Sequence, residues 1–453
     1  MNQIITRRAL IRKAVALGVS LPALNALLAQ PSIAAALQAE VAVTAAAETF
    51  SPAGFNRPVC PYGATPELAS FIDPTVEIED PRRVELARHI YIGPFARLLA
   101  NGAPIKLGEE TNMQDNVLIQ ARFVRPATEQ AKVTALGLRE DGGVEIAERC
   151  ILAHGATVKG PAKIGVGGGD IAVDPDNDQE VFLSFNCEVD GAILERNTGV
   201  SALGRVGPGV RLKSGFIVLP GKNVTTQAEA DDPKLGKVRL LVGADVAFNE
   251  AVIEVNVAFA SEYTRLYDEN PVNVYGINYD PGNTTFNHDR SLPILAGVPT
   301  QDPCCCNRII GDVRMADSRA RLDQVMGERI SLRADEGEPF MVGRIARMQD
   351  NVIFHALEEA ELIVGNNVSY GNKAIVHGGG RPVVNPGSDP TEPTIIEDDV
   401  TLKDMTVVFR SLIGRGSTIG TKSAVVGSVL APGTTIPDRT IYVNDAVFGT
   451  VEW

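Results

Sequence analysis

Large aromatic side chains are scarce in this 453-residue chain: aromatics make up 5% of it, with a single tryptophan. A chain short of rings but with 43 glycines and many small aliphatic residues favours narrow, repetitive packing. No run reaches the roughly 20 apolar residues that a membrane-spanning helix needs. Charged residues at 22% and hydrophobic residues at 44% exclude wholesale disorder. The length predicts two or three domains.

Positive charge is also in short supply. The chain has 42 Lys and Arg against 56 Asp and Glu, a net charge of −14. Residues 1–36 carry four of the basic residues and no acid, so the remainder stands at −18 (−14 − 4). An acidic body of this size argues against nucleic acid or an anionic membrane surface as the main partner.

Cysteine is limited to six residues, of which Cys304–Cys306 are contiguous. Adjacent residues rarely direct three thiolates at one ion, so a disulfide formed in an oxidising compartment is favoured over a metal site. The spacing does not identify the paired cysteines.

The N-terminus has the layout of a cleaved export signal. Arg7 and Arg8 precede a weakly apolar run, and small-residue cleavage sites follow. The arginine pair resembles a twin-arginine signal, which carries folded proteins to the periplasm or an equivalent lumen. We therefore expect an export signal at 1–36 and a linker at 37–65. The alternative is an amphipathic helix that stays attached.

A small aliphatic residue recurs at about every sixth position over much of the chain, with Gly, Asn or Asp between. Ile363–Val368 leads into Ile375, and Ile164, Val200 and Val206 continue the pattern in the first half. This period predicts triangular coils of short strands stacked along an axis, a left-handed parallel β-helix. The alternative is a sandwich of unrelated short strands.

A longer repeat divides the chain in two, because Asn112–Ala121 matches Arg347–Ala356. We expect two tandem β-helix domains: domain one at 66–270 and domain two at 307–453, joined by a proline-containing linker at 271–306. Domain one should end in a helix, because apolar residues recur there at helical spacing. They are Phe248, Val252, Val255, Phe259 and Leu266.

Three segments of domain two carry a specific resemblance: Ser331–Gly337, Met348–Glu358 and Gly365–Gly378. They resemble gamma-class carbonic anhydrases, and the resemblance extends over most of both domains from about residue 71. It implies a trimeric arrangement of left-handed β-helices with a metal ion between neighbouring domains. Two ligand histidines would come from one domain and the third from its neighbour.

The ligand positions that the resemblance implies are divided between the domains. Domain two keeps the first and last ligands, and domain one keeps the ligand lent to a neighbour: His355, His377 and His154. The other three positions have lost histidine: Gln120, Lys159 and Asn372. The losses are complementary, so one domain of each kind would complete a single three-histidine site.

The resemblance also implies catalytic roles in domain two for Arg333, Asp335, Glu336, Gln349, Asp350 and Glu358. Arg333 is expected to position bicarbonate, with Asp350 as its carboxylate partner and Asp335 nearby. Gln349 would hydrogen-bond the metal-bound water or carbon dioxide, and Glu336 and Glu358 would shuttle protons. The sequence departs from the family at Arg347, where Asn is common, and in lacking a long acidic loop after His355.

Three imidazoles and an open position suit a catalytic zinc, and iron(II) or cobalt could take its place. Such a metal lowers the pKa of bound water to about 7. The sequence thus predicts reversible hydration of carbon dioxide to bicarbonate by metal-bound hydroxide at a domain interface of a homo-oligomer. How two domains fill a threefold ring stays open: each kind could form its own ring, or the two could mix, with another gamma-class-like subunit as a further partner.

Two other functions are compatible with the fold. The lost ligands would suit a weak or inactive scaffold subunit of a larger assembly. A hexapeptide acyltransferase would share the β-helix, but the segments around His355 and His377 disfavour it.

Overall fold

The computed structural model describes residues 51–52, 70–168, 180–269, 307–311, 313–336, 339–357, 360–379 and 393–453. The predicted export signal, the linker at 271–306, Cys304–Cys306 and Glu358 lie outside these ranges. Phe50–Trp453 form one compact unit that contains both predicted domains. Among the described helices, none combines the length and apolarity needed to cross a membrane.

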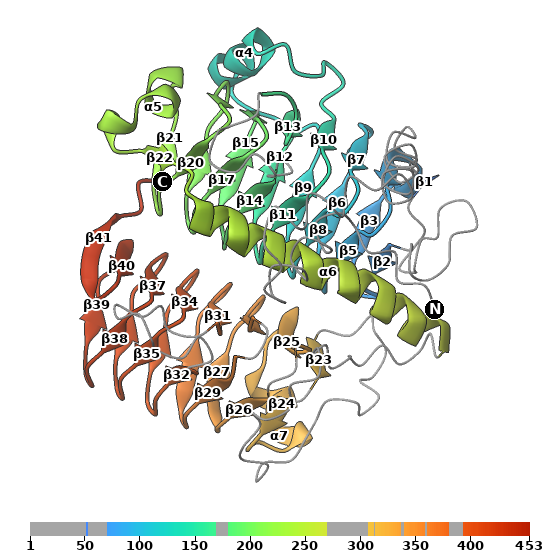
Figure 1. The fold of residues 1–453 in the computed structure, drawn as a ribbon. Helices are drawn as coiled ribbons and strands as arrows, with labels where there is room; N and C mark the ends of the chain where they lie inside the picture. Colours follow the sequence, from blue (N-terminus) through green and yellow to red (C-terminus); the bar gives the residue numbers. More distant parts are fainter. Residues whose placement is uncertain are drawn as a thin grey trace, which may run out of the picture. The chain divides into compact units, whose positions relative to one another are not determined.

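Domain one is a coil of short, mostly parallel strands that form three sheets within the described residues (Figure 1). The first sheet, in spatial order, contains β1 (Ser51–Pro52), β4 (Val84–Leu86), β7 (Ile105–Leu107), β10 (Val144–Ile146), β13 (Ala162–Ile164), β16 (Ile193–Leu194) and β19 (Arg211–Leu212). The second contains β2 (Phe71–Ile72), β5 (Tyr91–Ile92), β8 (Asn112–Met113), β11 (Cys150–Leu152), β14 (Val181–Leu183), β17 (Thr198–Val200), β20 (Phe216–Val218) and β22 (Val238–Leu240). The third contains β21 (Asn223–Val224), β18 (Arg205–Val206), β15 (Glu188–Asp190), β12 (Thr157–Lys159), β9 (Leu118–Gln120), β6 (Arg97–Leu99) and β3 (Glu77–Glu79).

Domain two repeats this architecture, again with three sheets in its described residues. One sheet contains β23 (Asn307–Gly311), β25 (Ile330–Ala334), β28 (Ile353–His355), β31 (Ile375–His377), β34 (Val407–Phe409), β37 (Ala424–Val426), β40 (Thr440–Val443) and β41 (Ala446–Thr450). The next contains β24 (Val313–Met315), β26 (Phe340–Val342), β29 (Leu362–Val364), β32 (Thr394–Ile396), β35 (Leu412–Ile413) and β38 (Val429–Leu430). The last contains β27 (Ile345–Met348), β30 (Val368–Tyr370), β33 (Thr401–Leu402), β36 (Thr418–Ile419) and β39 (Thr435–Ile436). The prediction of two tandem left-handed β-helices is confirmed.

The six-residue period explains both cores. The aliphatic residue of each hexad points into the coil, so successive rungs stack mostly small apolar side chains, and domain two adds the rings of Phe340, Phe354 and Tyr370 to its core. The turns between strands use left-handed backbone, which Asn tolerates better than most residues; Asn116, Asn186 and Asn351 have φ of 55°, 50° and 61°. The coil of domain one also holds the free thiols of Cys150 and Cys187, whose pKa values are raised by burial.

Five short helical segments of the described residues flank the coils: α4 (Ala127–Ala135), α5 (Gln227–Asp231), α7 (Arg319–Val325), and the single turns Pro81–Arg83 and Pro233–Leu235. One long helix, α6 (Gly243–Glu269), follows the last coil of domain one, as the apolar spacing predicted. It packs along β2, β5 and β11 and also reaches domain two, since Phe259 and Tyr263 share a cluster with Ile310 (Figure 1).

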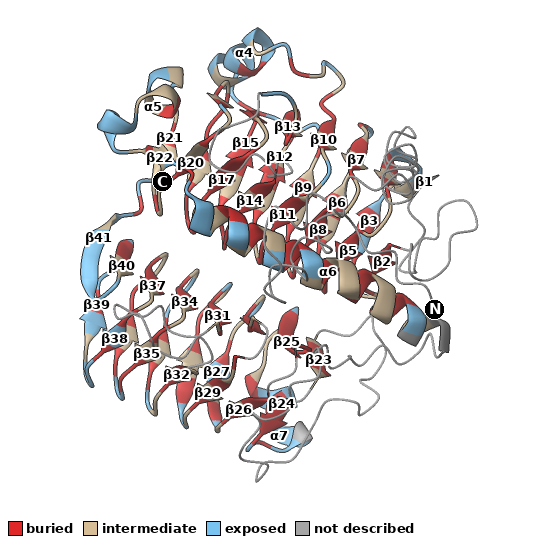
Figure 2. Ribbon diagram, in the orientation of Figure 1, coloured by how far each residue is buried: buried red, intermediate tan, exposed pale blue. Residues whose placement is uncertain are grey.

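The two β-helices pack directly against each other. A buried apolar cluster joins Phe185 and Leu203 of domain one to Ile353, Ile375 and Val407 on β28, β31 and β34. Figure 2 shows that much of the strand backbone of both β-helices belongs to buried residues. The C-terminus extends this contact, because the Trp453 indole donates a hydrogen bond to the Leu203 carbonyl at 2.6 Å. We name the β2–β22 sheet of domain one and the β23–β41 sheet of domain two the facing sheets.

Candidate metal centre

The three histidines that match the family's ligand positions lie together where the facing sheets meet. His355 and His377 end β28 and β31, and the strand register pairs them directly on successive rungs. Their spacing of 22 residues exceeds the 18 of three hexads (3 × 6) by four, so one coil with a longer turn separates them, and the strand pairing places both on the same face. His154 comes from domain one, in the turn after β11. Gly155 next to it has φ 72°, and a Cβ there would clash with the Asn186 side chain, so glycine is required for this turn.

One nitrogen of each ring converges on a common point. His355 Nδ1 lies 3.2 Å from His154 Nε2 and 3.2 Å from His377 Nε2. The three atoms all lie within 4.8 Å of one another, and the side chains are at most 3% exposed. This is the mixed arrangement of domain one and domain two, formed inside one chain.

The opposite nitrogen of each ring faces an acceptor. His377 Nδ1 donates to the Gly378 carbonyl at 2.6 Å, and His154 Nδ1 lies 2.9 Å from Asp115 Oδ2. His355 Nε2 lies 3.2 Å from Glu336 Oε1 and 3.4 Å from Asp335 Oδ1. These acceptors place the ring hydrogens on the outer nitrogens and direct three lone pairs inward. Metal-binding histidines show this pattern, so the residues fit a divalent cation.

A buried ionic network supports the histidines from behind. The Arg333 guanidinium donates to Asp115 through Nε at 3.0 Å and Nη2 at 3.1 Å, and to Asp335 Oδ2 through Nη1 at 2.6 Å. Ser331 Oγ also donates to Asp115, and Tyr263 Oη to Asp335. Asp115 and Asp335 bind this guanidinium, and Glu336 lies against His355, so three carboxylates and one guanidinium surround the imidazoles with a formal charge of −2 (−3 + 1). A divalent cation at the imidazoles would neutralise this charge.

The pKa shifts follow from burial and these charges. Burial lowers the pKa of His154 to about 4 despite Asp115, and burial together with the neighbouring imidazoles lowers that of His377. For His355, burial and Arg333 oppose protonation, but Glu336 and Asp335 outweigh them and raise the pKa. Burial would raise the pKa of Asp115, yet Arg333 and His154 hold it well below its usual range. Asp115 is thus a permanent anion behind His154.

The structure therefore brings together six of the residues predicted from sequence and leaves others apart. His154, His355, His377, Arg333, Asp335 and Glu336 form one cluster. Gln349 and Asp350 lie in a separate surface pocket beside Asn372. The expected pairing of Arg333 with Asp350 is wrong: Asp350 is exposed and accepts from the Glu328 backbone at 3.0 Å. The turn that carries Asp350 follows β27, which is not one of the facing sheets.

The places near the histidines that were expected for Gln349 and Asp350 are taken by their domain-one counterparts, Gln114 and Asp115, which follow β8. Asp115 lies one rung from His154, because Asn112 and Met113 pair with Ile151 and Leu152. Gln114 lines the cavity over the histidines. The signal was present in the sequence, since Gln114 and Asp115 are the catalytic-type residues that domain one retains in the Met-Gln-Asp-Asn repeat.

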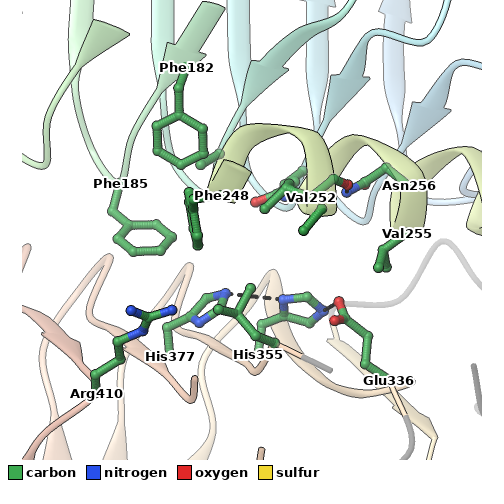
Figure 3. Close-up of a pocket in the computed structure, with 14 residues that line it drawn as sticks. Phe182, Phe185, Phe248, Val252, Val255, Asn256, Glu336, His355, His377 and Arg410 are labelled. Carbon is green, nitrogen blue, oxygen red and sulfur yellow. Dashed lines mark hydrogen bonds and ion pairs between the residues drawn. The ribbon is translucent and has the colours of Figure 1, made fainter. Parts of the chain in front are cut away.

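The cavity next to the histidines has a volume of about 250 Å³. Figure 3 shows His355, His377, Glu336 and Arg410 on one side of it. The opposite side is mainly apolar and is formed by the Phe182 and Phe185 region of domain one and by α6. From this helix come Phe248, Val252, Val255 and Asn256.

In domain one, the positions that correspond to His355 and His377 are occupied by Gln120 and Lys159, and Lys159 belongs to a cluster of ion pairs. Gln120 and Lys159 pair across β9 and β12 as His355 and His377 do in domain two. Lys159 Nζ binds Glu188 at 2.7 Å, and Arg205 Nε donates to Glu188 at 2.8 Å. Here the positive charge is a side chain, so this face needs no metal ion.

We expect Glu188→Gln to lower the free energy of unfolding at pH 7 by about 1.5–3 kcal/mol, the range for hydrogen bonds to charged groups. Burial raises the pKa of Glu188, but Lys159 and Arg205 outweigh it and lower the pKa. The carboxylate therefore stabilises the fold above its unfolded pKa of about 4.3 and loses this effect as pH falls through the lower folded value. Urea unfolding of both proteins at several pH values measures the difference.

The control is Glu85→Gln, which breaks a half-exposed pair with Lys106 at 2.9 Å and should change stability little. If the Glu188→Gln loss were equally large at pH 7 and pH 3, packing rather than charge would account for it.

A left-handed β-helix with three converging imidazoles at a domain contact is what the resemblance to gamma-class carbonic anhydrases implied, and the sequence comparisons find proteins that share this likeness. No family model matches the chain. A carbonic anhydrase of Methanosarcina thermophila is 26% identical over 182 residues, which cover 36% of this chain and 65% of that protein. A carboxysome assembly protein CcmM of Synechococcus elongatus is 30% identical over 143 residues, covering 29% of this chain and 23% of that protein.

A second CcmM, from Nostoc, is 25% identical over 148 residues, covering 30% of this chain and 23% of that protein. The matches thus span less than two thirds of each of these relatives. A hexapeptide transferase family protein of Anaplasma phagocytophilum overlaps 43% of this chain and 93% of its own, at 15% identity and a TM-score of 0.22, too low to bear on the argument. The resemblance to the gamma-class carbonic anhydrase family is confirmed, with two diverged domains in one chain.

Proposed function

We propose that this chain catalyses reversible hydration of carbon dioxide to bicarbonate at a metal centre shared by its two domains. The observation that carries the proposal is the convergence of His154 Nε2, His355 Nδ1 and His377 Nε2 within 4.8 Å in a buried site. We propose zinc as the metal, with iron(II) or cobalt as substitutes, because three imidazoles with an open position suit a catalytic zinc. When bound, such a metal supplies hydroxide near neutral pH by lowering the pKa of water.

The side chains around the histidines have separate tasks. Asp115 and Glu336 hold the rings of His154 and His355 in orientation. The apolar wall of α6 and domain one excludes bulk water and suits an uncharged gas molecule. Gln114 places an amide at the same cavity and could hydrogen-bond carbon dioxide.

Glu336 is the described residue best placed to accept a proton. It lines the cavity, is 7% exposed, and lies 3.2 Å from His355 Nε2. Positioned acid–base groups contribute roughly 10²–10⁴ to rate. Glu358, which lies outside the described residues, remains a proposed second shuttle on the resemblance alone.

We expect Glu336→Ala to slow carbon dioxide hydration at least about tenfold when metal is in excess, because no other described carboxylate lines the cavity. Stopped-flow hydration assays on wild type, Glu336→Ala and Glu358→Ala measure the effect. Imidazole buffer should partly restore the rate of whichever variant has lost the shuttle, since it accepts the proton directly. Chelation of the metal should abolish activity in all three.

Equal rates for wild type and the double variant Glu336→Ala/Glu358→Ala would exclude the shuttle role. A purified chain with no bound metal and no activity after metal addition would contradict the proposed function as a whole.

The second candidate is a non-catalytic scaffold subunit. It is favoured by the loss of histidine at Gln120, Lys159 and Asn372 and by the matches to two proteins named for carboxysome assembly. The same metal and activity measurements separate the two functions.

For either function we propose a homo-oligomer with a trimeric arrangement of domains, in which another gamma-class-like subunit could also take a place. The two facing sheets are not equivalent in the two repeats. The sequence match of Asn112–Ala121 with Arg347–Ala356 aligns β8 of the β2–β22 sheet with β27 of the β27–β39 sheet, whereas the β2–β22 sheet actually contacts the β23–β41 sheet. A head-to-tail contact of this kind closes a ring when a further domain fits between the ends. The faces that would receive it are the β3–β21 sheet and the β27–β39 sheet.

A further inference from the structure

The gamma-class resemblance assigns bicarbonate to Arg333, but the structure leaves this guanidinium no capacity for it. Arg333 is 1% exposed, and Asp115 and Asp335 take its Nε, Nη1 and Nη2 donors. Tyr91 and Phe259 cover its faces, with ring centroids 5.5 and 5.6 Å from Cζ. Arg333 therefore orients the carboxylates behind the metal centre and does not reach a substrate.

A different arginine faces the cavity without a partner. Arg410 follows β34, and its backbone N–H donates to the His377 carbonyl at 3.2 Å, so the two residues lie on adjacent rungs. Its side chain lines the cavity with His355, His377 and Glu336 (Figure 3). Among the described residues it makes no ion pair or side-chain hydrogen bond, and its Nε is buried and unsatisfied.

The surroundings of Arg410 hold the guanidinium in place without neutralising it. Phe409 and Phe248 stack on it, with ring centroids 4.8 and 5.7 Å from Cζ. A second cavity, on the other side of Arg410, is lined by Asp245. This carboxylate does not neutralise Arg410, because it accepts two hydrogen bonds of 2.7 Å from Arg239. Glu336, the carboxylate that shares the cavity, is engaged by His355. Burial lowers the pKa of Arg410, the cost expected for a cation without a counter-ion.

Two buried arginines elsewhere in the chain each have the carboxylate partner that Arg410 lacks among the described residues. Arg125 binds Asp190 at 2.6 Å, and Arg308 binds Asp73 at 3.1 Å. An arginine fixed between two rings, unpaired, and open to a cavity is therefore a vacant binding group. Its planar donors match a carboxylate-type anion in two-point contact.

We propose that Arg410 forms an anion subsite beside His377 that binds bicarbonate, the small planar anion that the proposed reaction produces or consumes. The inference rests on the proposed function for the identity of the anion, but not for the existence of the subsite. A divalent cation at the imidazoles would neutralise the two negative charges of the Asp115, Asp335, Glu336 and Arg333 network. The positive charge of Arg410 would then be the uncompensated charge of the cavity, which favours an anion there.

The test compares wild type with Arg410→Gln, Arg410→Lys and, as a matched control, Arg415→Gln. Arg415 lies in the same β-helix, is 65% exposed and pairs with Asp398 at 3.0 Å, so its loss should not affect the cavity. Calorimetric titration of the metal-loaded proteins with bicarbonate reports the subsite under the charge balance that favours an anion. We expect Arg410→Gln to weaken binding about tenfold, as loss of a charge-assisted contact does, and Arg410→Lys to weaken it less.

The enzyme kinetics of the metal-loaded proteins give a second readout. For Arg410→Gln the KM for bicarbonate dehydration should rise about tenfold, while the KM for uncharged carbon dioxide changes by less than about twofold. Thiocyanate inhibition should weaken in parallel. Equal bicarbonate affinity in metal-loaded wild type and Arg410→Gln would overturn the proposal, as would equal rises in both KM values. A wild type that binds bicarbonate through Arg410 yet hydrates no carbon dioxide would refute the proposed function and leave the subsite standing.

Discussion

Replacing His154 by Ala is expected to remove the metal from the chain, whereas Asn372→Ala should leave it bound. The two residues occupy the same ligand position of the two repeats, but only His154 lies within reach of His355 and His377. Loss of even an orienting partner behind a ligand weakens metal affinity about 10–100-fold, so loss of a ligand should exceed about 100-fold. Metal counted per chain after dialysis against a competing chelator measures this, and hydration activity should follow it.

The matched pair distinguishes the arrangements that the sequence left open. If domain-two copies formed their own ring, Asn372→Ala would lose metal and His154→Ala would keep it. Retention by both variants would show that neither arrangement holds the ion. A thermal melting curve for each variant provides the control for folding.

The coiled architecture could be predicted from the sequence because its cause is local. Each hexad places one aliphatic residue inside its own coil, and the 22-residue interval between His355 and His377 is about one coil plus a turn, so the sequence could indicate that the two residues stack. The division of ligands between domains also predicted the partner of these two residues, since His154 was the histidine left over at a matching position.

The residues behind the histidines could not be assigned in the same way. Asp115 and Asp350 stand in identical Met-Gln-Asp-Asn sequences, and nothing local says which of them reaches Arg333. That choice depends on which sheet of domain one docks on β25 and β28, a contact between residues more than 200 positions apart. Arg410 is harder still to find, because its importance lies in the absence of a carboxylate near it.

Asp115 contributes both to the contact between the two domains and to the orientation of the His154 ring at the metal centre. It belongs to domain one, is fully buried, and binds Arg333 of domain two through both carboxylate oxygens. Its Oδ2 also lies 2.9 Å from His154 Nδ1. Removing its charge would leave Arg333 buried with one carboxylate. The single oxygen of an amide at this position could accept from Arg333 or from His154, and its NH2 group would face the other donor.

We therefore expect Asp115→Asn to lower the free energy of unfolding by about 3–5 kcal/mol, the usual cost of breaking a buried ion pair from one side. Metal affinity should also fall about 10–100-fold, because His154 loses the partner that orients it. Asp350→Asn is the matched control, since it makes the same change in the same motif at an exposed site. Urea unfolding with metal removed separates the first effect from the second, and chelator competition measures the second. If Asp350→Asn were the more damaging change, Arg333 would have to pair with Asp350 in place of Asp115, and the contact between the β-helices would not organise the metal centre.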